Sequence, residues 1–292
     1  MDKVTGPLGP RRGIATVLRQ LREGSGKVLN DVAKDLMIST SKLSRLENAQ
    51  GRPLPRDIRD LIQYYGISGT SLAARLQRWV AAAQRPGWWT DFDAQVVGGL
   101  DAHLAYEADA TVERIYTLPF VPALLQTADY AEAIFRNMEH RSEAQVGQLL
   151  EVRKLRQRAL RSRDGLPPLQ LVAVTHESAL RQAVGSPRAL RDQLDALIER
   201  SRAPNVSLYI LPFASKPVFT MTCMYAYFEY QDDDDLEQDV VHVETHAGFL
   251  SLEDPERVAA YRDAHEALVE ASLSEESSLE LIRSVREEAG DA

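Results

Sequence analysis

Apolar residues recur every three or four positions through the first 86 residues, which is the spacing that places them on one face of a helix. This pattern predicts five short helices, over residues 11–23, 28–36, 40–48, 54–65 and 71–83. The run Gly24-Ser25-Gly26 ends the first of them, because glycine breaks helices. The first 86 residues are therefore predicted to form an all-α domain.

The second and third predicted helices are separated only by the turn Met37-Ile38-Ser39. Ser39 can cap the third helix through its side-chain oxygen, and Ile38 and Leu43 have the spacing of a hydrophobic staple. Leu43 and Leu46 would anchor this helix in the core and leave its polar residues outside. Two helices joined by a tight turn, the second polar on its outer face, are typical of a DNA-reading unit.

The outer face of the third helix carries side chains suited to nucleic acid. Short hydroxyl side chains near its N-terminus allow a close approach to the major groove, and Arg45 can donate two hydrogen bonds to a guanine edge. The outward-facing residues are Thr40, Ser41, Lys42, Ser44, Arg45 and Asn48. The alternative interpretation is a small helical bundle used for protein contacts.

A set of residues spread over the first three predicted helices and the turns between them supports the DNA-reading interpretation. Its positions are Leu21, Arg22, Gly26, Ala33, Leu36, Ser39, Ser41, Ser44, Arg45, Glu47 and Asn48. At these positions the sequence resembles the Xre and phage-repressor helix-turn-helix family. The residues that the resemblance implies to face bases are Thr40, Ser41, Ser44 and Arg45. Lys42 and Asn48 would lie nearer the phosphates, and Ser39 completes the predicted DNA-binding set.

The same resemblance implies a structural ion pair and shows two departures. Arg22 and Glu47 fall where the family forms an ion pair that stabilises the domain. The family's glutamine at the start of the second helix is Leu29 here, which removes a usual DNA contact. The turn glycine is Met37, which must adopt a conformation that glycine adopts more cheaply. Both departures favour weakened or altered DNA binding.

The pattern changes at Arg85-Pro86-Gly87, which marks a boundary between a domain over 1–86 and a domain over 87–292. Segments rich in β-branched and aromatic residues predict strands over 111–116, 169–174, 206–211, 224–228 and 240–244. Helices are predicted over 94–107, 142–163, 177–184, 188–201, 255–272 and 275–288, with one more capped by Thr127. Interleaved strands and helices predict an α+β domain with a mixed sheet.

Several stretches of the second domain are distinctive in combination. They are VPALLQTADYAEA from Val121, SALRQAV from Ser178, NVSLYILPF from Asn205, VHVE from Val241 and the closing LVEASLSEESSLELI. With them this half resembles the C-terminal domain of unknown function of the actinobacterial WhiJ-like regulators. The resemblance implies control of development or antibiotic production in filamentous actinobacteria. It also implies a small partner protein encoded nearby, in an antitoxin-like arrangement.

The distribution of charge changes the picture of a protein whose overall net charge of -9 would argue against nucleic acid. Residues 1–86 hold 15 Lys and Arg against 7 Asp and Glu, a balance of +8. The remaining residues hold 19 against 36, a balance of -17. A basic first domain on an acidic second domain can approach phosphates at one end only.

Other features of the sequence exclude several classes of protein. The single cysteine, Cys223, excludes an intrachain disulfide and a cysteine-clustered zinc site. No apolar run reaches the ~20 residues that span a bilayer, and no signal-peptide core is present. We therefore expect a cytoplasmic, nucleoid-associated protein that makes no membrane contact.

Motifs of catalysis are absent, since the sequence has no Gly-rich phosphate loop, nucleophile elbow or zincin motif. We expect no enzymatic activity and no cofactor. His242, Glu244 and His246 alternate along a predicted strand, so they would share one face and form a legitimate zinc or iron ligand set. An exposed strand face is the favoured interpretation.

Two further groups of residues have alternative interpretations. Six cations crowd one predicted helix, and they are Arg153, Lys154, Arg156, Arg158, Arg161 and Arg163. They suit a phosphate contact or an acidic partner, but a solvated helix paired with acidic neighbours is favoured. The aromatic-rich stretch from Tyr209 to Tyr230 can line a ligand pocket, although most such residues form core.

Together these features predict a sequence-specific transcriptional regulator that binds double-stranded DNA as a homodimer, because one recognition helix reads too few bases. The second domain would dimerise and receive a signal from a small-molecule effector or a partner protein. The alternative is an antitoxin-like interaction module that acts mainly by binding a small partner protein. Leu29 favours this alternative.

Overall fold

A computed structural model of the chain describes residues 8–92, 100–137, 141–163, 166–216, 223–230, 239–245 and 248–289. These residues form two compact units. The first unit takes in residues 8–91 and 100–109 together with Tyr230, and the second takes in the other described residues. The sequence boundary after residue 86 stays a prediction.

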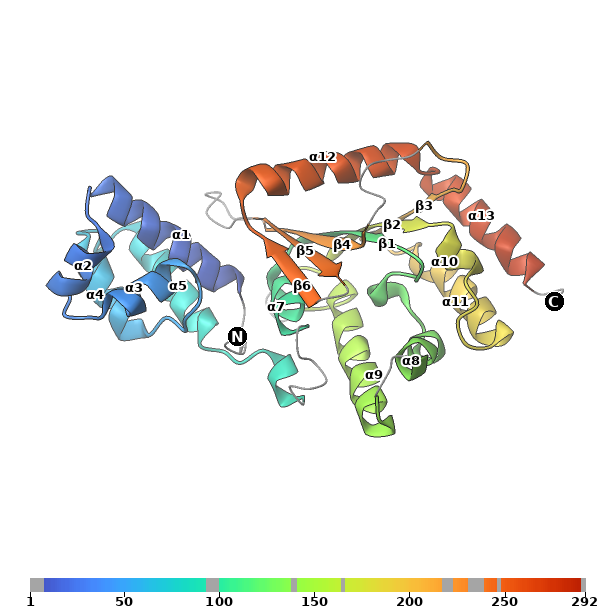
Figure 1. Ribbon diagram of the computed structural model, residues 1–292, viewed down its shortest axis with the longest axis horizontal. Coiled ribbons are helices and arrows are strands. Elements are labelled where there is room, and N and C mark those ends of the chain that lie inside the picture. Colours follow the sequence, from blue (N-terminus) through green and yellow to red (C-terminus); the bar gives the residue numbers. More distant parts are fainter. Residues whose placement is uncertain are drawn as a thin grey trace. The chain divides into compact units, whose positions relative to one another are not determined.

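The first unit is all-α, as predicted. Its helices are α1 (Gly9–Gly24), α2 (Leu29–Asp35), α3 (Thr40–Glu47), α4 (Pro55–Tyr64), α5 (Ser71–Ala83) and α7 (Asp101–Asp109), with a 3-10 turn η1 (Trp88–Asp91) (Figure 1). The first five lie where the apolar spacing predicted them. The start of α1 contacts α7, because the Gly9 N–H lies 3.3 Å from an Asp109 carboxylate oxygen and the Arg12 guanidinium lies 5.8 Å from the Tyr106 ring centroid.

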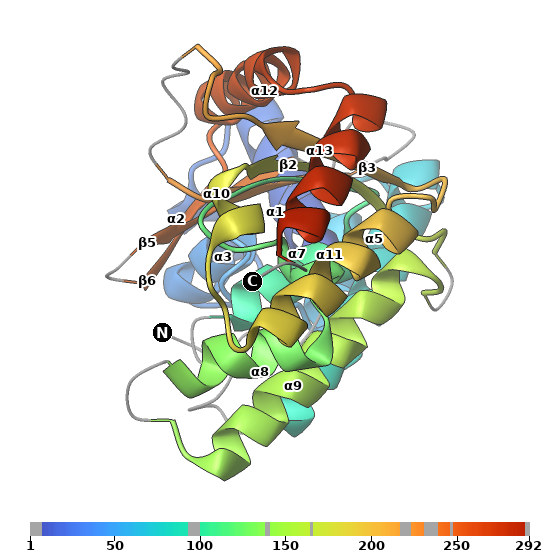
Figure 2. The ribbon, with the colours of Figure 1, turned by 90° about the vertical axis from the view of Figure 1, so that its right-hand side faces the viewer.

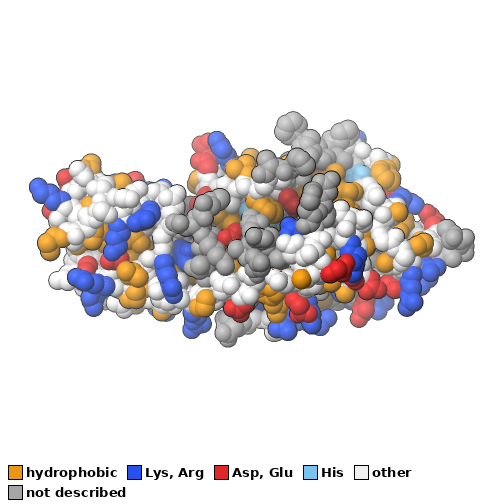
Figure 3. All heavy atoms as spheres, turned by 60° about the horizontal axis from the view of Figure 1, so that its bottom comes forward, with side chains coloured by type: hydrophobic (Ala, Val, Ile, Leu, Met, Phe, Trp, Pro, Cys, Tyr) orange, Lys and Arg blue, Asp and Glu red, His pale blue; other side chains and the backbone are white. Residues whose placement is uncertain are grey.

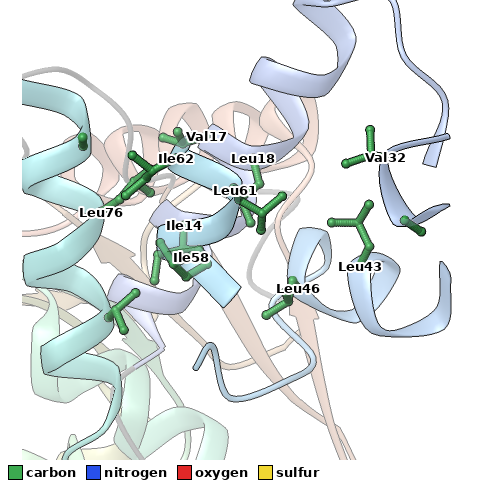
Figure 4. Packing of buried hydrophobic residues seen from close by; sticks show 13 residues of the cluster. Ile14, Val17, Leu18, Val32, Leu43, Leu46, Ile58, Leu61, Ile62 and Leu76 are labelled. Atoms are coloured by element: carbon green, nitrogen blue, oxygen red, sulfur yellow. The ribbon is translucent and has the colours of Figure 1, made fainter. Parts of the chain in front are cut away.

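The core of the first unit is built from the apolar faces of these helices (Figure 4). Leu43 and Leu46 of α3 and Val32 of α2 point into this core and are buried. The other labelled members are Ile14, Val17, Leu18, Ile58, Leu61, Ile62 and Leu76. Burial of α3 through two leucines fixes which of its faces remains outside, and that face is the polar one.

The second unit is built on a six-stranded mixed sheet among its described residues. The strands are β1 (Val112–Thr117), β2 (Gln170–His176), β3 (Val206–Leu211), β4 (Tyr225–Glu229), β5 (Val240–Thr245) and β6 (Gly248–Leu252). They follow the order β3-β2-β1-β4-β5-β6. The pairs β1–β2 and β2–β3 are parallel, whereas β4, β5 and β6 add antiparallel neighbours. The predicted α+β class with a mixed sheet is confirmed.

Helices cover both faces of this sheet (Figures 1 and 2). They are α8 (Ala128–Asn137), α9 (Glu143–Gln157), α10 (Ser178–Arg181), α11 (Pro187–Arg200), α12 (Pro255–Ala271) and α13 (Glu275–Glu288), with 3-10 turns η2 (Ala123–Leu125) and η3 (Arg158–Leu160). Val258 and Leu268 of α12 pack on one face against Tyr116 and Tyr225. The helices α8, α9 and α11 lie on the other face.

Two details of the second unit differ from the sequence prediction. The strand β6 was missed, because it is a short edge strand that starts at Gly248 and has no fully buried residue. The helix predicted over 142–163 begins as expected, with Ser142 and Gln145 forming a capping box, but its α-helical part ends at Gln157. The segment predicted as helix before residue 101 lies partly outside the described residues.

Candidate nucleic-acid interface

The turn between α2 and α3 has the geometry that the sequence predicted. The Ser39 side chain accepts a hydrogen bond from the Lys42 N–H at 3.1 Å, which caps α3. Met37 adopts a φ of 53°, the left-handed conformation that glycine favours, and its side chain is 93% exposed. A non-glycine residue therefore holds the turn with its apolar side chain in solvent.

An ion pair between α1 and α3 holds the C-terminal end of α3. The Arg22 Nε–H group lies 2.9 Å from each carboxylate oxygen of Glu47, whose side chain is buried. The hydrogen bond to Glu47 is the main reason why the pKa of Arg22 is raised. The expected structural pair is confirmed, and its geometry is that of a charge-assisted hydrogen bond.

A second arginine, which sequence reasoning missed, supports the same end of α3. Arg19 donates to the Glu47 carbonyl at 2.7 Å and to the Asn48 side-chain oxygen at 2.9 Å. Asn48 in turn donates to the Ser44 carbonyl at 2.7 Å. The signal was the position of Arg19 three residues before Arg22, on the same helix face. Asn48 is therefore exposed and also takes part in the hydrogen bonds that stabilise the end of α3.

Two more residues of the predicted DNA-binding set have partners within the unit. The Lys42 ammonium lies 2.7 Å from a carboxylate oxygen of Asp57, at the start of α4. The other oxygen of Asp57 is buried and has no hydrogen-bond partner among the described residues. The Thr40 hydroxyl donates to the Asn30 side chain at 2.8 Å. These contacts fix α3 against α4 and α2.

Ser41 and Arg45 differ from the rest of the set. Both are exposed and lie four residues apart, so they share one face of α3. Neither side chain has a hydrogen bond or ion pair with any residue that the structure describes. Ser44, partly buried, lies next to Arg45 on α3. The surface that remains available for a partner is therefore centred on Ser41 and Arg45.

The surroundings of this surface are polar and basic. Lys and Arg side chains predominate over Asp and Glu on the face of the first unit shown in Figure 3. Lys34 of α2 is exposed and has no ion pair within the described chain. Leu29, at the start of α2, packs against the core instead of extending outward. The exposed polar residues at the start of α2 are Asn30 and Asp31, which sequence reasoning did not single out.

The metal-ligand set considered for the second domain is only partly described. His246 lies outside the described residues. The His242 ring is buried, its Nδ1 lies 3.0 Å from the Ser251 hydroxyl, and the ring stacks on Phe249 with centroids 5.0 Å apart. Glu244 is exposed. His242 of β5 is thus packed against Ser251 and Phe249 of β6, so the expectation of an exposed strand face is wrong at this residue.

The cations predicted on one helix are distributed over α9 and the turn after it. Lys154 pairs with Glu151 at 3.4 Å, as a solvated helix face would. Arg156 is buried, and Arg163 donates to two backbone carbonyls. Arg153 makes a hydrogen bond to the Gln126 side chain. Hydrogen bonds to neutral groups are therefore part of the environment of these cations, beside the ion pair of Lys154 with Glu151.

The two units define a protein with a helix-turn-helix domain and an α+β domain. Comparison with families agrees, since residues 14–79 match the family described as Helix-turn-helix domain. Residues 100–284 match the family described as Domain of unknown function (DUF5753), and the chain belongs to this family. Comparisons with curated proteins and with solved structures gave no match. No described helix is long and apolar enough to cross a membrane.

Proposed function

We propose that the protein is a sequence-specific transcriptional regulator that reads double-stranded DNA with α3. The observation that carries this proposal is the exposed pair Ser41 and Arg45, which has no partner among the described residues while neighbouring polar residues hold α3 in place. The helix-turn-helix match supports DNA as the partner. An arginine held on a fixed helix can donate two hydrogen bonds to guanine, which discriminates between bases.

The rest of the proposal concerns the assembly and its setting. The protein would bind as a homodimer, because a single recognition helix contacts too few bases for useful specificity. The second unit would mediate dimerisation and receive a signal from a small molecule or a partner protein, without enzymatic activity. The resemblance to the WhiJ-like regulators supports action at the nucleoid of an actinobacterium.

Within α3 the residues would have different roles. Ser41, Ser44 and Arg45 would contact bases. Lys42 would position α3 through its ion pair with Asp57, because breaking that pair would leave a buried carboxylate without a counter-charge. Ser39, Thr40 and Asn48 would act mainly through the hydrogen bonds that fix the helix.

Selection of binding sites from a random duplex library tests this function. We expect one enriched motif, with two-fold symmetry if the protein binds as a dimer. Arg45→Ala should lose about 1–3 kcal/mol of discrimination at one base position. Lys42→Ala should leave the dependence of log K on log salt unchanged, whereas loss of a phosphate contact would lower the slope by about 1.

Leu29 gives the second candidate function its support, because an apolar residue packs where the family has a DNA-contacting glutamine. In that case the protein would act mainly by binding a small partner protein. Absence of any enriched motif at permissive salt would favour this candidate over DNA reading. Capture of a small partner by the purified chain would then be the next measurement.

A further inference from the structure

The two edges of the sheet in the second unit differ in how they are covered. The strand β3 forms one edge and β6 forms the other (Figure 1). On the outer side of β3, the Ile210 carbonyl accepts a hydrogen bond from the Leu273 N–H at 2.9 Å. The Ile210 N–H donates to the Ser278 hydroxyl oxygen, also at 2.9 Å. The link between α12 and α13 and the first turn of α13 therefore cover this edge.

The strand β6 has no such cover among the described residues of the second unit. Its five residues, Gly248–Leu252, pair with β5 in one unbroken antiparallel register. Within that part of the chain, no backbone hydrogen bond joins β6 to any element other than β5. Alternate N–H and C=O groups of an edge strand point away from its sheet. A strand of this kind can pair with a further strand through these groups.

The strand β6 also lacks the features that prevent pairing at a free edge. Proteins protect such edges with charged side chains, proline or β-bulges. The sequence of β6 is Gly-Phe-Leu-Ser-Leu, without charge or proline, and its pairing with β5 includes no bulge. Leu250, the middle residue of the strand, is 51% exposed. The edge is therefore uncharged, partly apolar and suited to a partner strand.

We propose that β6 pairs antiparallel with β6 of a second copy of this chain, so that the two sheets become one continuous sheet. The two-fold axis passes through Leu250, which therefore lies opposite Leu250 of the second copy. Phe249 then lies opposite Ser251 of that copy, and the glycine at the start of β6 lies opposite the leucine at its end. All five residues have a partner, and no like charges meet.

Two observations favour a second copy over an unrelated peptide. Strands that capture foreign peptides obtain specificity from pockets for alternate side chains, whereas the short sequence of β6 is matched to itself. Residues 87–292 have a charge balance of -17, so two second units repel each other on approach, and an uncharged edge lowers that cost. An isologous contact of this kind also closes as a dimer. The inference rests on the dimerisation proposed above and assigns it to one strand.

Leu250 is the residue to change, because a charge placed there meets its own copy at the two-fold axis. Leu250→Lys and Leu250→Glu should each fold, since Leu250 is half exposed, and each should repel itself. An equimolar mixture of the two variants should pair again, because lysine then lies opposite glutamate. Phe213→Lys and Phe213→Glu are matched controls, since Phe213 is 59% exposed and follows β3 at the covered edge.

Sedimentation velocity of the full chain over a range of concentrations, without DNA, measures the dimer. The wild type and both Phe213 variants should dimerise with similar dissociation constants. Each Leu250 variant should dimerise at least about tenfold more weakly, whereas their mixture should return to within about threefold of the wild type. Hydrogen exchange of the wild type should show protection of residues 248–252 that grows with protein concentration. This measurement needs no variant, so it decides the question even where a substitution disturbs the fold.

Three results would overturn the proposal. One is a wild type that stays monomeric at every concentration. Another is a dimer that persists unchanged in both Leu250 variants, or a mixture of folded variants that stays monomeric. The third is protection of residues 248–252 that does not depend on concentration, which would mean that another part of the same chain covers the edge. The dimer is measured without DNA, so its failure is distinguishable from failure of the proposed base reading by α3.

Discussion

The two units use their buried polar groups differently. In the first unit, Glu47 and Asp57 are buried carboxylates that pair with arginine and lysine and fix α3 against its neighbours. In the second unit, the buried carboxylate of Glu177 pairs with Arg181 four residues later, at 3.0 Å, and neutral contacts join elements that are distant in the sequence, since the hydroxyls of Thr117 and Thr175 lie 3.2 Å apart across β1 and β2. Ser278 likewise accepts from the Ile210 N–H at 2.9 Å and ties α13 to β3.

This difference shows where each unit can meet a partner. The ion pairs of Glu47 and Asp57 hold α3 on its inner side. They leave an exposed polar face with a fixed geometry, which a base-reading surface requires. The neutral hydrogen bonds of the second unit join its strands and helices to one another.

The largest expected effect comes from changing the core of one unit and observing both. Leu43→Ala should destabilise the first unit by about 2–5 kcal/mol, because Leu43 is fully buried and its removal leaves a cavity. All 3 tryptophans of the sequence lie in the first unit, so their fluorescence follows that unit, while far-UV circular dichroism follows both. The fluorescence transition should move to lower denaturant.

Leu268→Ala is the matched control, since Leu268 is fully buried in the second unit. It should move the circular dichroism transition and leave the fluorescence transition in place. Equal movement of both transitions by either variant would show that the two units unfold as one, and the comparison between them would then fail.

The second-largest expected effect is a loss of stability of the second unit as the pH falls. Burial, and to a smaller extent the charge of Arg114, lower the pKa of His265 to about 3 from its usual 6.5. The unfolded chain therefore binds a proton below pH 6.5 that the folded chain refuses, so stability falls as the pH falls from 6.5 towards 3. Between pH 7 and pH 5 this should cost about 2 kcal/mol.

Denaturant unfolding at a series of pH values, followed by circular dichroism, measures this slope. His265→Gln removes the titrating group while keeping a side chain that can accept from the Tyr225 hydroxyl, which lies 3.1 Å from His265 Nδ1. The variant should lose most of the dependence between pH 7 and pH 5, whatever its stability at neutral pH. An unchanged slope in His265→Gln would show that other groups cause the acid sensitivity.

Local pattern was enough to predict most of the first unit. The cap at Ser39 and the anchors Leu43 and Leu46 follow from spacing within one helix, whereas the ion pair of Arg22 with Glu47 was predicted from the resemblance to the helix-turn-helix family. The contact of α1 with α7 did not follow, because it joins residues about one hundred positions apart, such as Gly9 and Asp109. Periodicity carries no information about such pairs.

The second unit shows the same limit. All strands of this unit except β6 were predicted from their composition, but the order of the strands in the sheet was not. The hydrogen bond from Arg200 to the Gln126 carbonyl joins residues 74 positions apart and is set by how α11 packs. In the sequence, the cations of α9 and the turn after it looked like a solvated helix, because charge runs on helices usually are.

The smallest expected effect concerns the turn that presents α3. Met37 holds a φ of 53° with its side chain in solvent, so replacement by glycine removes backbone strain without removing packing. Met37→Gly should stabilise the first unit by about 0.5–1 kcal/mol, because the relief of strain exceeds the extra entropy of the unfolded chain. The tryptophan fluorescence transition measures this gain.

Gly26→Ala is the opposite control, because Gly26 has a φ of 66° and open space around it. It should destabilise the first unit by a similar amount, since alanine would be strained there. If Met37→Gly stabilises the unit but weakens binding to the selected duplex, the exposed methionine contacts the DNA and the strain is retained for that contact. If stability falls instead, Met37 contributes to the folded unit through contacts other than those seen around this turn, and strain is not what distinguishes it from the family's glycine.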